Sequence, residues 1–222
     1  MSVAEENNLN PINWKAAYKA NCFKIRLFIG IVLFAGILTV FPFFFQYIES
    51  RDGLSLDDSI VAAIPPHDVS IPIFIFIWST TLLLALRCIR DPQLLLISLY
   101  CFIVLTLTRM CTIYFIPLNP PQGLIPLVDP LSNFFYGKTN FVTKDLFFSG
   151  HTSSQFIFFL SLKKKRDKAF ALLSTLVVGC LVLVQHVHYT VDVVAAIPLT
   201  YLCFLLGRRI ALGRGEASLT DH

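Results

Sequence analysis

Six runs of mainly apolar residues divide the chain, and short polar or turn-rich segments separate them. The runs cover 25–47, 70–88, 93–116, 146–162, 169–187 and 189–207. A helix needs about 20 mostly apolar residues to cross a bilayer, and five of the runs are close to that length or longer. The run at 146–162 is the exception, because it is short and contains several hydroxyl and amide side chains. The pattern predicts an all-α, polytopic membrane protein with six transmembrane helices.

Composition supports a bilayer rather than water as the solvent. The chain of 222 residues is 55% hydrophobic and 14% charged, with a mean hydropathy of +0.69. Soluble proteins have about 25% charged residues, so this chain lacks the polar groups to cover a soluble surface. The net charge of +4 is too small to favour nucleic acid. The six cysteines lie in or beside apolar runs without a C-x-x-C pair, which argues against a disulfide framework or a cysteine-held metal.

The distribution of basic residues predicts the orientation. If the six runs alternate, one side receives 1–24, 89–92, 163–168 and 208–222, and with the boundary residues Arg26 and Arg87 it holds 14 of the 18 lysines and arginines. The block KKKRDK at 163–168 dominates this set. The positive-inside rule therefore predicts a cytoplasmic tail at 1–24, a transmembrane domain at 25–207 and a cytoplasmic tail at 208–222. The first run is long for a signal-peptide core, so we expect it to be retained.

The opposite side receives two longer loops and three candidate catalytic groups. The loop at 48–69 is acidic, and the proline-rich loop at 117–145 is apolar enough to lie on the membrane or cover another element. His151, His188 and Asp192 are distant in sequence, yet the alternation places all three at this face. Ionisable residues inside a membrane are costly and are usually functional.

His188 and Asp192 stand four residues apart in the stretch QHVHYTVDVV at 185–194. On a helix this spacing puts two side chains on one face, with Cβ atoms about 6 Å apart. A carboxylate so placed can fix one imidazole nitrogen and leave the other free to react. His186 points elsewhere on a helix, and we expect it to be a bystander.

The sequence FFSGHT around His151 predicts a helix that begins at Ser149 and Gly150. Serine can cap the helix, glycine lets a ligand approach its free N–H groups, and a helix N-terminus binds anions. No G-x-S-x-G elbow is present, so Ser149 is not predicted to be a nucleophile. With Arg109 and Lys144 nearby, the expected ligand is a phosphate at the outer membrane surface.

SGHT at 149–152 and HYTVDVV at 188–194 resemble the two signature stretches of the type 2 phosphatidic acid phosphatase superfamily, in its sphingomyelin synthase branch. TRMCTIYFIPLNPP at 108–121 resembles the third-span motif of that branch. The chain departs from the phosphatase pattern, because K-x6-R-P is absent and no arginine precedes His188. A phosphodiester carries less charge than a phosphomonoester, so fewer arginines favour headgroup transfer over phosphate hydrolysis.

The resemblance implies the role of each residue in a lipid phosphotransferase. His188 would attack the phosphorus of a phospholipid such as phosphatidylcholine, Asp192 would orient it, and His151 would act as acid and then base towards ceramide or a similar lipid. Arg109, Lys144, Ser149, Gly150 and Tyr189 would bind substrate, without cofactor or metal. A choline group would need aromatic or acidic neighbours such as Asp129, Phe134, Tyr136 or Asp145.

Several alternatives stay open from the sequence alone. A phosphatase or a phospholipase C-like hydrolase would use the same groups with water as acceptor, whereas a scaffold or transporter fits the one-sided placement of the charged residues less well. The headgroup could be phosphocholine, phosphoethanolamine or inositol phosphate, and the acceptor could be ceramide or diacylglycerol. The oligomeric state (homo-oligomer included) and the membrane, either a bacterial inner membrane or one of the secretory pathway, are undetermined.

Overall fold

The computed structural model describes residues 14–127 and 142–213, and this part of the chain contains helices and no strand. An isolated bridge joins Leu54 and Leu118. The helices are α1 (Trp14–Lys19), α2 (Asn21–Ser50), α3 (Ser59–Ala62), α4 (Ser70–Cys88), α5 (Pro92–Phe115), α7 (Gly150–Ser161), α8 (Lys165–Val184) and α9 (Thr190–Leu212). The all-α prediction is confirmed for the described residues.

Five of these helices, α2, α4, α5, α8 and α9, are long and apolar enough to cross a membrane. They are consistent with a polytopic membrane protein and correspond to five of the six predicted runs, although α2 and α9 extend several residues beyond the predicted bounds. The run at 146–162 differs from the prediction. It forms only the 12-residue α7, because Ser149 caps the helix and Leu162 has an extended backbone.

At 1.5 Å per residue α7 is about 18 Å long, so it would need its extended flanks to complete a crossing. Six spans, and the sides on which the two ends of the chain lie, therefore stay predictions.

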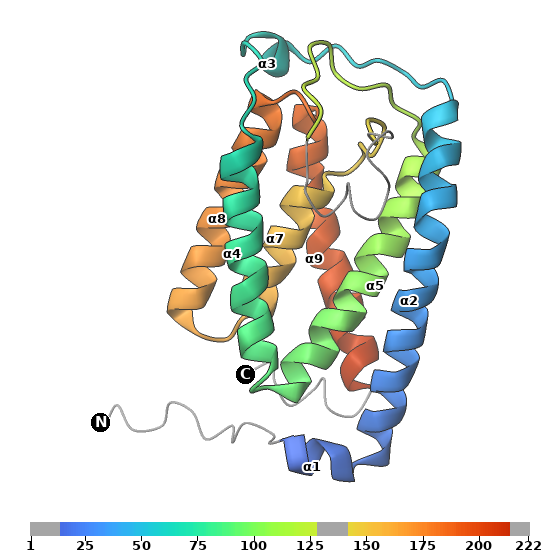
Figure 1. Ribbon diagram of the computed structural model, residues 1–222, viewed down its shortest axis with the longest axis vertical. Coiled ribbons are helices and arrows are strands. Elements are labelled where there is room, and N and C mark those ends of the chain that lie inside the picture. Colours follow the sequence, from blue (N-terminus) through green and yellow to red (C-terminus); the bar gives the residue numbers. More distant parts are fainter. Residues whose placement is uncertain (1–13, 128–141, 214–222) are drawn as a thin grey trace.

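The short helix α7 occupies the middle of the bundle (Figure 1), where it packs against α4, α5, α8 and α9. Its polar residues are thereby removed from lipid: Thr152, Ser153 and Gln155 are buried. The Gln155 side-chain oxygen accepts hydrogen bonds from the hydroxyls of Thr80 on α4 and Ser174 on α8. Burial in protein explains why this helix tolerates a polarity that a lipid-facing helix could not.

The outer helix α2 is attached to the bundle through arginines at its two ends. Arg26 donates to the carbonyl oxygens of Ala211 and Leu212 at the end of α9, at 3.1 and 2.8 Å. Arg51 donates to the carbonyls of Ile113 and Tyr114 at the end of α5, at 2.9 and 2.8 Å. These bonds satisfy carbonyl groups that a helix C-terminus leaves without intrahelical partners.

The loops 51–69 and 116–127 meet at the end of the bundle where α8 turns into α9 (Figure 1). Asn119 and Gly53 exchange two hydrogen bonds, and Tyr189 joins both loops through its hydroxyl group. The prediction that the proline-rich loop covers another element thus holds for its described part. Together these loops fix the turn that carries His188.

Candidate active site

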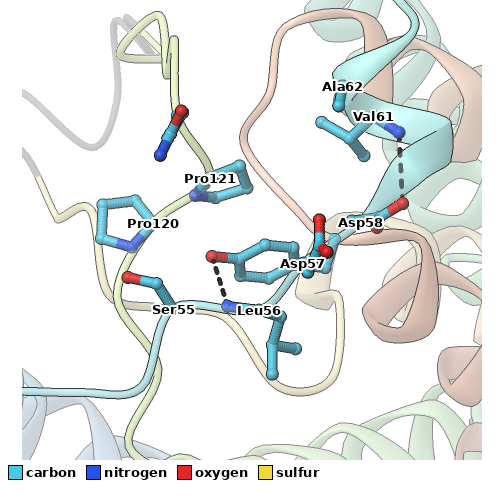
Figure 2. A pocket seen from close by; sticks show the side chains of 10 residues that line it. Ser55, Leu56, Asp57, Asp58, Val61, Ala62, Pro120 and Pro121 are labelled. Atoms are coloured by element: carbon cyan, nitrogen blue, oxygen red, sulfur yellow. Dashed lines mark hydrogen bonds between the residues drawn. The ribbon is translucent and has the colours of Figure 1, made fainter.

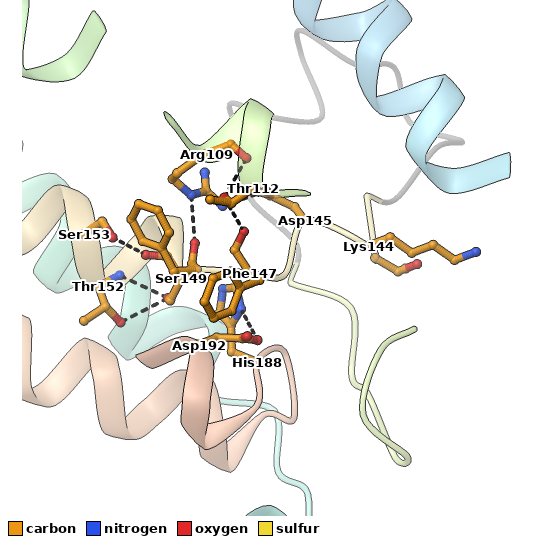
Figure 3. A network of polar contacts seen from close by, with 12 residues as sticks. Arg109, Thr112, Lys144, Asp145, Phe147, Ser149, Thr152, Ser153, His188 and Asp192 are labelled. Atoms are coloured by element: carbon orange, nitrogen blue, oxygen red, sulfur yellow. Dashed lines mark hydrogen bonds and ion pairs between the residues drawn. The ribbon is translucent and has the colours of Figure 1, made fainter. Parts of the chain in front are cut away.

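The candidate site forms where the N-termini of α7 and α9 meet. The backbone N–H of Ser149 donates to the carbonyl of Asp192 at 3.1 Å, which ties the two helix starts together. Ser149 is the N-cap of α7, as predicted, and its hydroxyl accepts from the N–H of Thr152 at 3.3 Å. Two segments far apart in sequence are therefore held in one arrangement by backbone and capping bonds (Figure 3).

His188 and Asp192 are in contact, but not for the reason that their spacing suggested. α9 begins only at Thr190, so His188 precedes the helix. Asp192 reaches back from the first turn: its Oδ2 accepts from the N–H of Tyr189 at 3.0 Å and lies 3.3 Å from His188 Nδ1. The side chains of His188 and Asp192 are 1% and 0% exposed. Helix capping, rather than a shared helix face, brings the imidazole to the carboxylate.

The second imidazole comes from the first turn of α7. The ring centroids of His151 and His188 are 6.1 Å apart, and the ring planes meet at 63°. With Nδ1 of His188 directed at Asp192, the reactive nitrogen of this ring is Nε2. The two rings are close enough to act on the same substrate group.

Arg109 of α5 completes the cluster. Its Nε donates to the Phe148 carbonyl at 2.9 Å, and its Nη2 lies 2.6 Å from Asp145 Oδ1. A Cβ atom on Gly150 would stand only 2.4 Å from Nη1 of this guanidinium. Gly150 therefore has a role that the sequence did not reveal, because it leaves room for Arg109 at the start of α7.

Two predicted substrate contacts point elsewhere. The Lys144 ammonium donates to the backbone carbonyls of Glu49 and Arg51 at the end of α2, and Figure 3 shows it directed away from the histidine pair. The carboxylate of Glu49 in turn accepts from the N–H of Lys144 at 2.7 Å. As placed, Lys144 anchors the segment that leads into α7, and its contact with a phosphate stays a prediction.

Tyr189 is the second such residue, since its hydroxyl accepts from the N–H of Leu56 and donates to the Asn119 carbonyl. It lines a cavity of about 330 Å³ between the two loops, beside Asp57 and Pro120 (Figure 2). This side chain therefore supports the loop structure above the site. Of the residues suggested for a choline group, Asp145 pairs with Arg109, whereas Asp129, Phe134 and Tyr136 lie outside the described residues.

His186 stands apart from the pair, as expected for a bystander, and it has a structural role. Its backbone is left-handed, with a φ of 57°, and its ring is buried. Nδ1 lies 2.6 Å from the Gln122 carbonyl and Nε2 lies 2.9 Å from the Ile64 carbonyl. This side chain links both loops to the turn between α8 and α9.

Asp58 is a structural residue of the site region that sequence reasoning missed. Its carboxylate accepts from the N–H and the hydroxyl of Thr190, at 2.6 and 3.1 Å, and also caps α3. Partial burial raises the pKa of Asp58, but the hydrogen bonds from Thr190 and the α3 backbone outweigh this and leave the pKa below its usual range. Nothing in the acidic loop marked this aspartate among its neighbours.

Comparison with known families bears on the same segment of the chain. Residues 144–209 match the family model described as PAP2 superfamily C-terminal. The match supports the type 2 phosphatidic acid phosphatase superfamily. It includes His151, His188 and Asp192, whereas Arg109 lies before it. No curated protein and no solved structure matches the chain. The match supports an enzyme of the lipid phosphatase or phosphotransferase type in a membrane.

Proposed function

We propose that this protein is a lipid phosphotransferase that moves a phospho-headgroup, phosphocholine in the first instance, from a glycerophospholipid to the primary hydroxyl of ceramide. The observation that carries the proposal is the His151–His188–Asp192 arrangement beside the guanidinium of Arg109. It supplies a nucleophile, a group that orients it, a proton donor and one fixed positive charge.

In the first step Nε2 of His188 attacks phosphorus, and the N–P bond forms as the P–O bond to diacylglycerol breaks. Asp192 holds Nδ1 and stabilises the charge that develops on the ring. His151 donates its proton to the departing glycerol oxygen. Because the two rings come from separate segments and their centroids are 6.1 Å apart, both can contact one phosphoryl group.

In the second step the hydroxyl oxygen of ceramide attacks phosphorus and the N–P bond breaks. His151, now neutral, removes the hydroxyl proton, so that both residues return to their starting protonation states. Arg109 would contact a non-bridging phosphate oxygen in each step. The N–H groups exposed at the start of α7 add a weak positive field.

The distribution of cations favours a phosphodiester over a phosphomonoester substrate. Arg109 is already paired with Asp145, Lys144 binds the end of α2, and Arg51 binds the end of α5. A dianionic phosphate would meet little uncompensated positive charge among these residues. A monoanionic phosphodiester requires less, which supports transfer or phospholipase C-like cleavage over phosphatase activity.

The acceptor can be tested with purified protein, headgroup-labelled phosphatidylcholine and ceramide. We expect labelled sphingomyelin and one diacylglycerol per product, and no product from His188→Ala or His151→Ala. Without ceramide, a transferase should release at most about one diacylglycerol per protein, because the intermediate has no acceptor. Continuous release of free phosphocholine would instead identify a hydrolase and contradict the proposed reaction.

A further inference from the structure

A groove between α4 and α8 lies at the end of the bundle opposite the histidine pair. Its cavity of about 380 Å³ is lined chiefly by Leu82, Leu83 and Leu86 of α4 and by Phe170 of α8, with Arg166 and Asp167 where α8 begins. The two helices run side by side on the outside of the bundle (Figure 1). The groove is thus a feature of the outer surface, away from the proposed reaction.

The walls of this groove are apolar and open to the surroundings. Leu82 and Leu86 are 61% and 51% exposed, and Leu172, Leu173 and Leu176 continue an exposed apolar surface along α8. In a membrane protein such a surface faces lipid chains. The charged residue Arg166 lies at the end of this apolar surface. It belongs to the first turn of α8, one turn before Phe170.

The charges at the start of α8 leave Arg166 available. Asp167 is neutralised by Arg87, whose Nε and Nη2 lie 2.6 and 3.0 Å from the carboxylate oxygens. Lys163 is paired with Asp91 at 2.5 Å. Arg166 is exposed and has no hydrogen bond or ion pair with any residue in the described part of the chain. The polar end of the groove therefore carries a net positive charge.

We propose that this groove binds an anionic glycerophospholipid, with an acyl chain against the leucines and Phe170 and the phosphate on Arg166. The guanidinium group offers paired N–H donors that match two phosphate oxygens. The start of an apolar helix places it at the depth of lipid phosphates. A zwitterionic lipid is disfavoured, because its ammonium group would face Arg166 and the exposed Lys164.

Lipid binding can be measured by quenching of a tryptophan placed in the groove. Phe170→Trp, with Trp14 and Trp78 replaced by Phe, provides the reporter, and phosphatidylglycerol brominated on its acyl chains is the quencher. We expect saturable quenching that is stronger than with brominated phosphatidylcholine. Arg166→Gln should weaken it about tenfold, as loss of a charge-assisted hydrogen bond predicts.

Arg90→Gln is the matched control, because Arg90 is exposed at the same end of the bundle but does not line the groove. Equal weakening by both variants would show a general charge effect and overturn the site. Equal quenching by the two lipids would also overturn it. So would full competition by water-soluble glycerol phosphate, because it would show that the acyl chain contributes nothing.

Discussion

The Asp192 carboxylate has two functions that a single substitution can separate. It caps α9 through the N–H of Tyr189 and holds Nδ1 of His188. Asp192→Asn keeps the shape and an acceptor for the cap, but its amide can also present an N–H to the ring and stabilise the wrong tautomer. We expect headgroup transfer to fall on the order of 10³- to 10⁴-fold, as in other enzymes with a carboxylate-oriented histidine.

Asp192→Asn should lower the thermal unfolding midpoint in detergent far less than Asp192→Ala does, because the alanine variant loses the helix cap as well. A loss of activity that merely parallels the loss of folded protein would assign Asp192 to structure alone.

Gly150 offers a second test at the residue scale, because its role is steric. Gly150→Ala places a methyl group 2.4 Å from Nη1 of Arg109, so the guanidinium must move away from the start of α7. We expect about a 10²-fold loss of transfer, in line with the effect of misplacing a catalytic group by about 1 Å.

Gly36→Ala is a suitable control, since a Cβ at Gly36 in α2 meets nothing within 4 Å. It should leave activity unchanged, and the better helix propensity of alanine should leave stability equal or slightly higher. Unchanged activity of Gly150→Ala would show that Arg109 does not need its observed position.

At the scale of elements, the attachment of the loop 51–69 to the start of α9 depends on Asp58. The lowered pKa of this carboxyl group means that its ionised form is bound more strongly in the folded state. Its contribution is therefore complete above the unfolded-state pKa of about 3.9 and disappears as pH falls through the lower folded-state value.

Asp58→Ala should accordingly destabilise the protein by about 1 kcal/mol at neutral pH, the usual effect of losing a helix cap. Thermal unfolding of both proteins between pH 7 and pH 3 checks the sign. The difference between them should be constant above about pH 5 and should shrink below about pH 4. A difference that grows on acidification would contradict the assigned bonds.

The elements also show how far the sequence could predict this molecule. Length and hydropathy located α2, α4, α5, α8 and α9, because lipid imposes long apolar helices. The same length criterion overestimated the helix in the fourth run, at 146–162. There, burial among other helices permits a short helix with polar residues. Hydropathy cannot distinguish a residue that faces lipid from one that faces protein.

In the site, the capping pattern predicted the start of α7, and the four-residue spacing predicted the pairing of His188 with Asp192, although that pairing arises from the capping of α9. Lys144 and Asp145 could not be placed in the same way, since neighbouring charges in an extended segment can face either direction. In the structure, Lys144 binds the end of α2 and Asp145 pairs with Arg109.

At the scale of the whole molecule, the helices separate two chemically different ends. The histidine pair lies at one end, and the basic start of α8 lies at the other (Figure 1). The predicted orientation and six crossings place residue 55 outside and residue 164 inside, with α4, α5 and α7 between them. Two crossings rather than three would put both residues on one side.

Single cysteines at these positions, Ser55→Cys and Lys164→Cys, can report this in a background without native cysteines. A membrane-impermeant maleimide should label position 55 in intact cells and position 164 only after permeabilisation. Labelling of both from outside would overturn the crossing by α7, and labelling of position 164 alone would overturn the orientation.

The proposed reaction requires that His188 carries the headgroup between two lipids. It predicts that protein incubated with ³²P-labelled phosphatidylcholine, without ceramide, retains label that survives alkali and is released by acid, as a phosphorus–nitrogen bond requires. Addition of ceramide should move that label into sphingomyelin, and His188→Gln should acquire none. Label retained by His188→Gln, or transfer through wild-type protein that is never labelled, would show that His188 is not the carrier.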